Sequence, residues 1–244
     1  MSRLFRSMRF LGILATAVTL LGASVAQAGF IQTESDGTTL YVQNGKLRGD
    51  NAESGDMWSI IDMSKGTITM VNPEEKSYFE GTIDEYCSSM RTMMDSMSQF
   101  MGGLIPKPAK KSKVEVVKAG PGGKVAGYDT TRYKVMVDGV LREELWLAND
   151  QALLKELGNP QTMAKFSQCA AMETDYEASS EYQGVMKAGW PLKTVSHIDG
   201  KAETDTEVAR IDKTDIPAAK FAAPKGYVRK PISAMFDSMD MEEE

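Results

Sequence analysis

The clearest pattern of hydrophobic and polar positions begins at residue 83 and keeps a helical period for about five turns. When residues are placed at 100° intervals, the apolar side chains fall within about 140° of arc and polar side chains occupy the remainder. The apolar positions are Ile83, Tyr86, Cys87, Met90, Met93, Met94, Met97, Phe100 and Met101. Thr82 and Glu85 have the spacing of a capping box, and Gly102-Gly103 is a stop signal. We therefore expect an amphipathic helix whose apolar face needs a sheet to cover it.

Short runs of β-branched and aromatic residues on both sides of this helix predict antiparallel strands. Before the helix, the expected strands are residues 38–42, 57–63, 67–71 and 77–79. After it, they are residues 114–117, 128–137, 140–147, 190–198 and 202–211. Asp138-Gly139 suits a type I′ hairpin, Asp199-Gly200 joins the last two strands, and Gly120-Pro121-Gly122-Gly123 is expected to be a turn.

Two short helices are predicted between residues 149 and 170. Asn149 is placed to cap the first, and Gly158-Asn159-Pro160 ends it and starts the second, because proline is favoured at a first helical position. The apolar residues of these helices are Leu153, Leu154, Leu157, Met163, Phe166 and Cys169. The chain is therefore expected to be an α+β protein.

The first 28 residues have the features of a secretory signal peptide. Arg3, Arg6 and Arg9 precede an apolar stretch from Phe10 to Leu21, which is shorter than the roughly 20 residues that span a bilayer. Ala26-Gln27-Ala28 has the small-x-small form of a cleavage site. We expect cleavage after Ala28 and a periplasmic protein.

Charge and length limit the classes that remain. The leader holds three of the 28 basic residues and none of the 34 acidic ones. The chain without the leader therefore has 25 basic and 34 acidic residues, a net charge of −9. Nucleic acid is excluded as a partner, because phosphate binding needs a concentrated basic face. Residues 29–231 have the size of a single domain, and the acidic residues 232–244 are expected to be a mobile tail.

The two cysteines, Cys87 and Cys169, are most simply interpreted as one structural disulfide, because an exported protein folds in an oxidising compartment. A redox or metal-binding pair is the alternative. The chain has no C-x-x-C motif and no histidine near either cysteine, which disfavours that alternative.

Motifs of catalysis are absent from the sequence. There is no G-x-S-x-G, no H-E-x-x-H and no P-loop, and the single histidine cannot form a relay or a multi-histidine metal site. Paired carboxylates such as Glu143 and Glu144 are adjacent in sequence and point to opposite faces of a strand. We expect a protein that is not an enzyme and needs no cofactor.

The closing residues Asp215-Ile216-Pro217, Phe221, Pro224 and Gly226-Tyr227 form a pattern that, with residues 57–63 and 71–78, resembles a known superfamily. The order of elements is similar to that of the periplasmic lipoprotein carriers (LolA/LolB-like), and within them to a Met-rich family of exported bacterial proteins. The resemblance implies an incomplete, strongly curved antiparallel β-barrel whose concave, open side is covered by helices. It also implies an apolar cavity that holds acyl chains. The ligand-contacting residues of the carriers have no recognisable positions here, so no functional residue is carried across.

The methionine-rich helix face supports three interpretations. As the wall of a cavity, it would present flexible, polarisable side chains to varied apolar guests. The residues of that expected wall are Tyr86, Met90, Met93, Met94, Met97, Met101 and Trp58. Core packing is the second interpretation, and Cu(I) binding by soft thioethers is the third. We expect a soluble binding protein for an apolar ligand, a lipid or acyl chain; an envelope sensor or scaffold domain is a further alternative.

Four lysines lie close together at Lys107, Lys110, Lys111 and Lys113. Such a cluster is typical of a solvated loop. Alternatively, it steers the protein to anionic lipid headgroups and gives a transient contact with a membrane surface.

Overall fold

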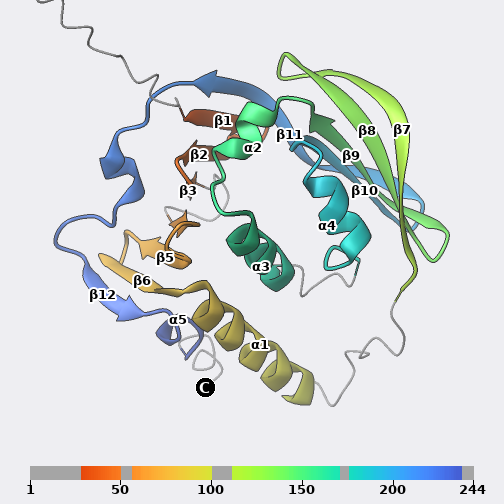
Figure 1. Ribbon diagram of the computed structural model, residues 1–244. Helices are drawn as coiled ribbons and strands as arrows, with labels where there is room; N and C mark the ends of the chain where they lie inside the picture. The colour runs from red at the N-terminus through yellow and green to blue at the C-terminus, as the bar shows by residue number, and fades with distance from the viewer. Residues whose placement is uncertain (1–28, 51–56, 101–111, 171–175, 238–244) are drawn as a thin grey trace, which may run out of the picture.

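A twelve-stranded sheet that does not close on itself is the framework of the computed structural model (Figure 1). The structure describes residues 29–50, 57–100, 112–170 and 176–237. The strands follow the order β12-β6-β5-β4-β3-β2-β1-β11-β10-β9-β8-β7, and each pairs antiparallel with its neighbours except β12, which runs parallel to β6. The strands are β1 (Phe30–Glu34), β2 (Thr39–Gln43), β3 (Lys46–Asp50), β4 (Trp58–Asp62), β5 (Thr67–Asn72), β6 (Ser77–Thr82), β7 (Val114–Val125), β8 (Tyr128–Val137), β9 (Val140–Ala148), β10 (Trp190–Ile198), β11 (Lys201–Lys213) and β12 (Val228–Pro231). The prediction of an α+β protein with an open, curved antiparallel sheet is confirmed.

The sheet curves around a group of helices, with α2, α3 and α4 on its inner side (Figure 1). The helices are α1 (Ile83–Phe100), α2 (Gln151–Lys155), α3 (Pro160–Ala170), α4 (Ser180–Met186) and α5 (Ala234–Asp237), with a 3-10 turn, η2, at Ala218–Phe221. The main hydrophobic core includes inward side chains of β2 to β6, such as Val42, Ile61 and Phe79, packed with Ile83 of α1 and Leu153 of α2. A smaller core under α4 contains Tyr182 and Val185. The helices therefore fill the concave side rather than forming a separate layer.

Tight hairpins set the register of the sheet. Four two-residue turns, at Asn44-Gly45, Ala126-Gly127, Asp138-Gly139 and Asp199-Gly200, have positive φ at both positions. That combination defines the type I′ turn, whose twist matches the twist of the flanking strands. The expected hairpins at Asp138-Gly139 and Asp199-Gly200 are thus confirmed.

The N-terminus of α1 and the disulfide that links this helix to α3 agree with the predictions from the sequence. The Glu85 carboxylate accepts a hydrogen bond from the Thr82 backbone N–H at 2.7 Å, and the Thr82 hydroxyl accepts one from the Glu85 backbone N–H at 3.1 Å. This reciprocal pair is the capping box. The predicted disulfide between Cys87 and Cys169 is present and joins α1 to α3 across 82 residues of chain. The expected stop at Gly102-Gly103 lies outside the described residues.

Two expectations about elements are wrong. Strand β7 was expected to end at residue 117, but it continues through Gly120-Pro121-Gly122-Gly123 to Val125, with two register shifts that absorb these residues as bulges. Glycine is needed there because a Cβ at Gly122 would lie 2.6 Å from Cδ1 of Trp146. Asp150, not Asn149, caps α2, since its side chain accepts a hydrogen bond from the Ala152 backbone N–H. Strand β12, which adds a parallel edge, was not expected.

The expected mobile tail is packed where the structure describes it. Ile232 and Phe236 are buried, and the Phe236 ring lies 5.6 Å from the ring of Tyr86 on α1. Residues 238–244 and the predicted signal peptide, residues 1–28, lie outside the described residues. Within the described part of the chain, none of the helices is long and apolar enough to cross a membrane.

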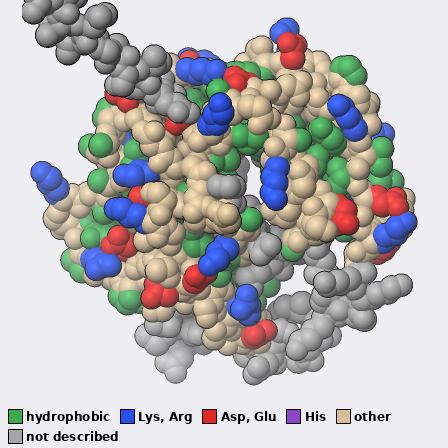
Figure 2. Space-filling view, viewed as in Figure 1, with side chains coloured by type: hydrophobic (Ala, Val, Ile, Leu, Met, Phe, Trp, Pro, Cys, Tyr) green, Lys and Arg blue, Asp and Glu red, His purple; other side chains and the backbone are tan. Residues whose placement is uncertain are grey.

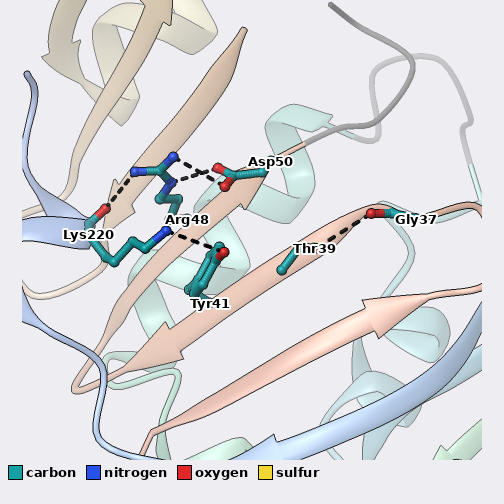
Figure 3. Close-up of polar contacts among 6 residues, drawn as sticks. All are labelled: Gly37, Thr39, Tyr41, Arg48, Asp50 and Lys220. Atoms are coloured by element: carbon teal, nitrogen blue, oxygen red, sulfur yellow. Dashed lines mark hydrogen bonds and ion pairs between the residues drawn. The ribbon is translucent and has the colours of Figure 1, made fainter. Parts of the chain in front are cut away.

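The outer face of β2 and β3 holds the closing segment of the chain. Val42 and Leu47 face the core, so Tyr41 and Arg48 point outward. Figure 3 shows the Arg48 guanidinium bound to both carboxylate oxygens of Asp50 and to the Lys220 carbonyl oxygen. The same guanidinium stacks 3.7 Å from the centre of the Trp58 ring. The hydrogen bond to the Lys220 carbonyl oxygen holds η2 against the sheet, and the contacts with Asp50 and Trp58 fix the Arg48 side chain.

Candidate ligand-binding cavity

The junction between α2 and α3 is fixed to the β2–β3 hairpin. Glu156, which is buried, accepts the Asn44 backbone N–H through its carboxylate at 2.9 Å and the Gly45 N–H through its carbonyl at 2.7 Å. Gly158 has a positive φ and approaches Gly45 so closely that a Cβ there would lie 2.8 Å from the Gly45 Cα. The end of α2 is therefore held against the sheet by hydrogen bonds and by two glycines.

The opposite wall is α4, which starts at the N-cap Ser179. Its Tyr182 and Val185 are buried against the smaller core, which includes Leu145 and Leu147 of β9. Gln183 and Met186 of the same helix line the space toward α2 and α3, and Met186 also packs against the smaller core. Helix α4 thus packs on the sheet and also borders the space between the helices.

A cavity of about 320 Å³ lies between α2, α3, α4 and the start of β10. Its lining is formed by Leu154, Leu157, Gly158, Met163, Ala164, Gln183, Met186, Lys187, Trp190 and Pro191. Figure 2 shows a hollow near the middle of the face drawn, with hydrophobic side chains at its border. The volume is at the lower end of the range of about 300 to 1,000 Å³ typical of small-molecule sites.

Trp190 is the largest aromatic in this lining, and its polar atom is already bonded. The indole Nε1 donates a hydrogen bond of 2.7 Å to Oε1 of Gln32, a buried residue of β1. The ring also packs edge-on against Phe30, with centroids 5.2 Å apart. Trp190 therefore offers the cavity an apolar surface and no free donor.

A second, larger hollow of about 740 Å³ lies between the start of α1 and β12. Its charged side chains already have partners: Arg229 pairs with Glu80, Lys230 pairs with Glu75, and Glu85 caps α1. Because this groove is more polar than the smaller cavity and its charged groups already have partners, the smaller apolar cavity is the better ligand site.

Behind α4, a buried carboxyl group has no cationic partner among the described residues. Glu143 of β9 is 4% exposed, its Oε1 is 3.4 Å from the Tyr182 hydroxyl that donates to it, and its Oε2 has no hydrogen bond. Burial, reinforced by the negative charges of Glu177 and Asp205, raises the pKa of Glu143 to about 8. The same burial raises the pKa values of Tyr176 and Tyr182, so both phenols stay protonated. This cluster is neutral at pH 7 and lets α4 pack on the sheet.

The residues expected to form the wall lie elsewhere. Tyr86 packs on Phe236, and burial raises the pKa of its phenol; Trp58 lies under Arg48 on the outer face. Met90, Met93 and Met94 are half-buried on α1. Met101 and the side chain of Met97 lie outside the described residues. None of the described members of that set lines the 320 Å³ cavity, so their role as ligand contacts stays a prediction.

The lysine cluster is described only at its end. Lys113 forms an ion pair with Glu115, and its backbone N–H donates to Asp138, whereas Lys107, Lys110 and Lys111 lie outside the described residues. A contact between this cluster and a membrane therefore also stays a prediction.

None of the lining residues was predicted as a ligand contact, although several lie in predicted elements. Leu154, Leu157 and Met163 belong to the predicted helix pair, and Trp190 to a predicted strand. The residues of α4 were not assigned to any element. The available signal was Ser179 followed by Glu181, an N-cap with an acid in the first turn.

A comparison with known protein families identifies the family of this chain. No curated protein matches the chain. A family model described as "Domain of unknown function (DUF4412)" matches residues 31–227, a span that begins in β1 and includes every lining residue of the cavity. The chain therefore belongs to the DUF4412 family.

Proposed function

We propose that this protein is a non-catalytic, exported binding protein that holds an apolar ligand, a lipid or single acyl chain, in the cavity between α2, α3, α4 and β10. The observation that carries the proposal is the cavity itself: about 320 Å³, bordered by leucine, methionine, tryptophan and proline side chains. Only Gln183 and Lys187 bring polar side-chain groups to the lining, and this pair offers no nucleophile with an adjacent base.

The cavity volume indicates the size of the guest. An apolar cavity of about 150 Å³ accepts one benzene ring, so about 320 Å³ accommodates roughly a dozen carbon atoms. At about 0.8 kcal/mol for each buried methylene, a chain of that length gains about 10 kcal/mol. Association costs about 4 kcal/mol or more, which leaves about 6 kcal/mol and a Kd of tens of micromolar. This affinity suits a carrier that must load and release its cargo.

Two further features support an exported carrier. The expected signal peptide precedes the domain, and the Cys87–Cys169 disulfide joins α1 to α3, as expected of a protein that folds in an oxidising compartment. An open curved sheet with helices on its inner side is also the architecture expected from the lipoprotein-carrier resemblance. We propose on this basis that the family is related to those carriers and that the protein acts in the periplasm.

The proposal is tested by asking what the protein holds and whether the cavity holds it. The full chain is expressed, the exported protein is purified, and an organic extract is analysed by lipid mass spectrometry, alongside binding of a fluorescent fatty acid. Ala164→Phe places a ring in the cavity, and Ala152→Phe adds the same ring on an exposed face of α2.

The wild type and Ala152→Phe are expected to bind the probe with a Kd of tens of micromolar. Ala164→Phe is expected to lose binding while it keeps its circular dichroism spectrum. If neither an extracted lipid nor saturable probe binding is found in the wild type, the proposal fails. If Ala164→Phe binds as well as Ala152→Phe, the ligand does not occupy this cavity.

A further inference from the structure

The cavity has one charged side chain in its lining, and that charge is positive. Lys187 follows the last residue of α4 and is exposed at the cavity rim. The lining residues of the described chain include no aspartate or glutamate. A lone cation beside an apolar chamber is the arrangement that recognises an amphiphile with a negative head group.

Among the described residues, nothing occupies the Lys187 ammonium group, so it is free to meet such a head group. Two other lysines beside the helices are engaged with carboxylates: Lys165 pairs with Asp84 at 3.2 Å and Lys213 with Asp150 at 2.9 Å. Within the described ranges, no carboxylate lies within 4.0 Å of the Lys187 ammonium group.

Gln183 lies one helical turn before Lys187 and adds a second polar group at the same rim. Its Nε2 donates to the Glu177 carbonyl oxygen at 2.9 Å, which fixes the amide and leaves Oε1 without a hydrogen-bond donor among the described residues. An oriented amide and a cation on one side of α4 give the rim a polarity that the rest of the lining lacks.

A simpler role for Lys187 is the stabilisation of the carbonyl end of α4. That role does not require a place in the cavity lining. It is also small, because α4 has only seven residues and the effect is screened at an exposed site.

We infer that the ligand is a single-chain amphiphile with an anionic head group, whose chain of roughly a dozen carbons fills the cavity and whose head lies against Lys187. This inference rests on the proposed function and deepens it. The volume excludes a second chain of the same length, so a diacyl lipid would leave one chain outside.

Three ligands with the same chain separate the contributions: dodecanoate, dodecyl phosphate and dodecanol, each titrated below its micelle concentration. The wild type is compared with Lys187→Gln and with Lys155→Gln, which removes another exposed lysine, at the end of α2 and outside the lining. We expect the wild type and Lys155→Gln to prefer dodecanoate to dodecanol. Lys187→Gln is expected to weaken dodecanoate binding about three- to tenfold and to leave dodecanol binding unchanged within about twofold.

Each result bears on a different statement. If none of the three ligands binds the wild type, the proposed function itself fails. If all bind and Lys187→Gln changes none of them more than Lys155→Gln does, the cavity holds chains but the head-group inference is overturned. A preference for dodecyl phosphate over dodecanoate would keep the inference and identify a phosphate-type head as the source of the charge.

Discussion

Replacing Glu143 by glutamine is expected to remove a large part of the pH dependence of stability. In the folded protein, the carboxyl group is 4% exposed, receives one long hydrogen bond from Tyr182 and faces the negative charges of Glu177 and Asp205. Its pKa is raised from an ordinary value of 4.5 to about 8. Glutamine has nearly the same shape and remains neutral at every pH.

The sign of the pH dependence follows from which state, folded or unfolded, binds the proton more tightly. Below pH 4.5 both states are protonated; between pH 4.5 and about 8 the unfolded chain loses the proton and the folded protein keeps it. The free energy of unfolding therefore falls as pH rises through this range and levels off above it. At 1.36 kcal/mol for each pKa unit, the change contributed by Glu143 is at most about 4 to 5 kcal/mol.

Urea denaturation of the wild type and Glu143→Gln, followed by circular dichroism from pH 4.5 to 8.5, measures this contribution. The difference in unfolding free energy between the two proteins is the quantity of interest, because other titrating groups cancel in it. We expect the difference to shift in favour of the glutamine variant by several kcal/mol as pH rises. A difference that stays constant within about 1 kcal/mol would show that the carboxyl group is ionised or solvated in the folded protein, and would refute the reasoning.

Three smaller changes test other parts of the structure. Gly184 lies inside α4 with open space around its missing side chain, so Gly184→Ala should raise the unfolding free energy by about 0.5 to 1 kcal/mol; an unchanged or lower urea midpoint would contradict this. Replacing Cys87 and Cys169 together by alanine should lower it by up to about 4 to 5 kcal/mol for an 82-residue separation, and an unaltered midpoint would count against a stabilising disulfide. Met90→Leu with Met94→Leu should leave probe binding within about twofold, because neither residue lines the cavity and the volumes are similar; a tenfold loss would instead make α1 a ligand wall.

The sequence was sufficient where one local signal decided the structure. Thr82 and Glu85 form the capping box that their spacing indicates, and Asp138-Gly139 forms the expected hairpin. Such features depend on hydrogen bonds and φ values within a few residues. The disulfide could also be predicted, since an exported chain with two cysteines has one simple pairing.

Strands β1 and β3 were missed because tertiary contacts stabilise them. Strand β3 has one core-facing apolar residue, Leu47, while Arg48 depends on Trp58 and Asp50 for its partners. In β1, the buried Gln32 bonds to Trp190. No periodicity relates residues 158 positions apart, although Asn44-Gly45 was a usable hairpin signal before β3.

The cavity was the least predictable feature. Its walls come from three short helices and a strand, and a helix as short as α4 shows too few turns for a periodic pattern. The long methionine-rich face of α1 was the more visible signal, and the structure places its described residues away from this cavity. A space between elements depends on their packing and not on any one pattern.

The most direct test of the central claim uses Trp190, which lines the cavity. In a variant with Trp58→Phe and Trp146→Phe, both on the outer face, Trp190 is the remaining tryptophan of the chain. Titration with a brominated fatty acid of about twelve carbons should quench its fluorescence saturably, with a Kd of tens of micromolar, and Ala164→Phe should abolish the effect. No quenching, or equal quenching after Ala164→Phe, would contradict an acyl chain in the space between α2, α3 and α4.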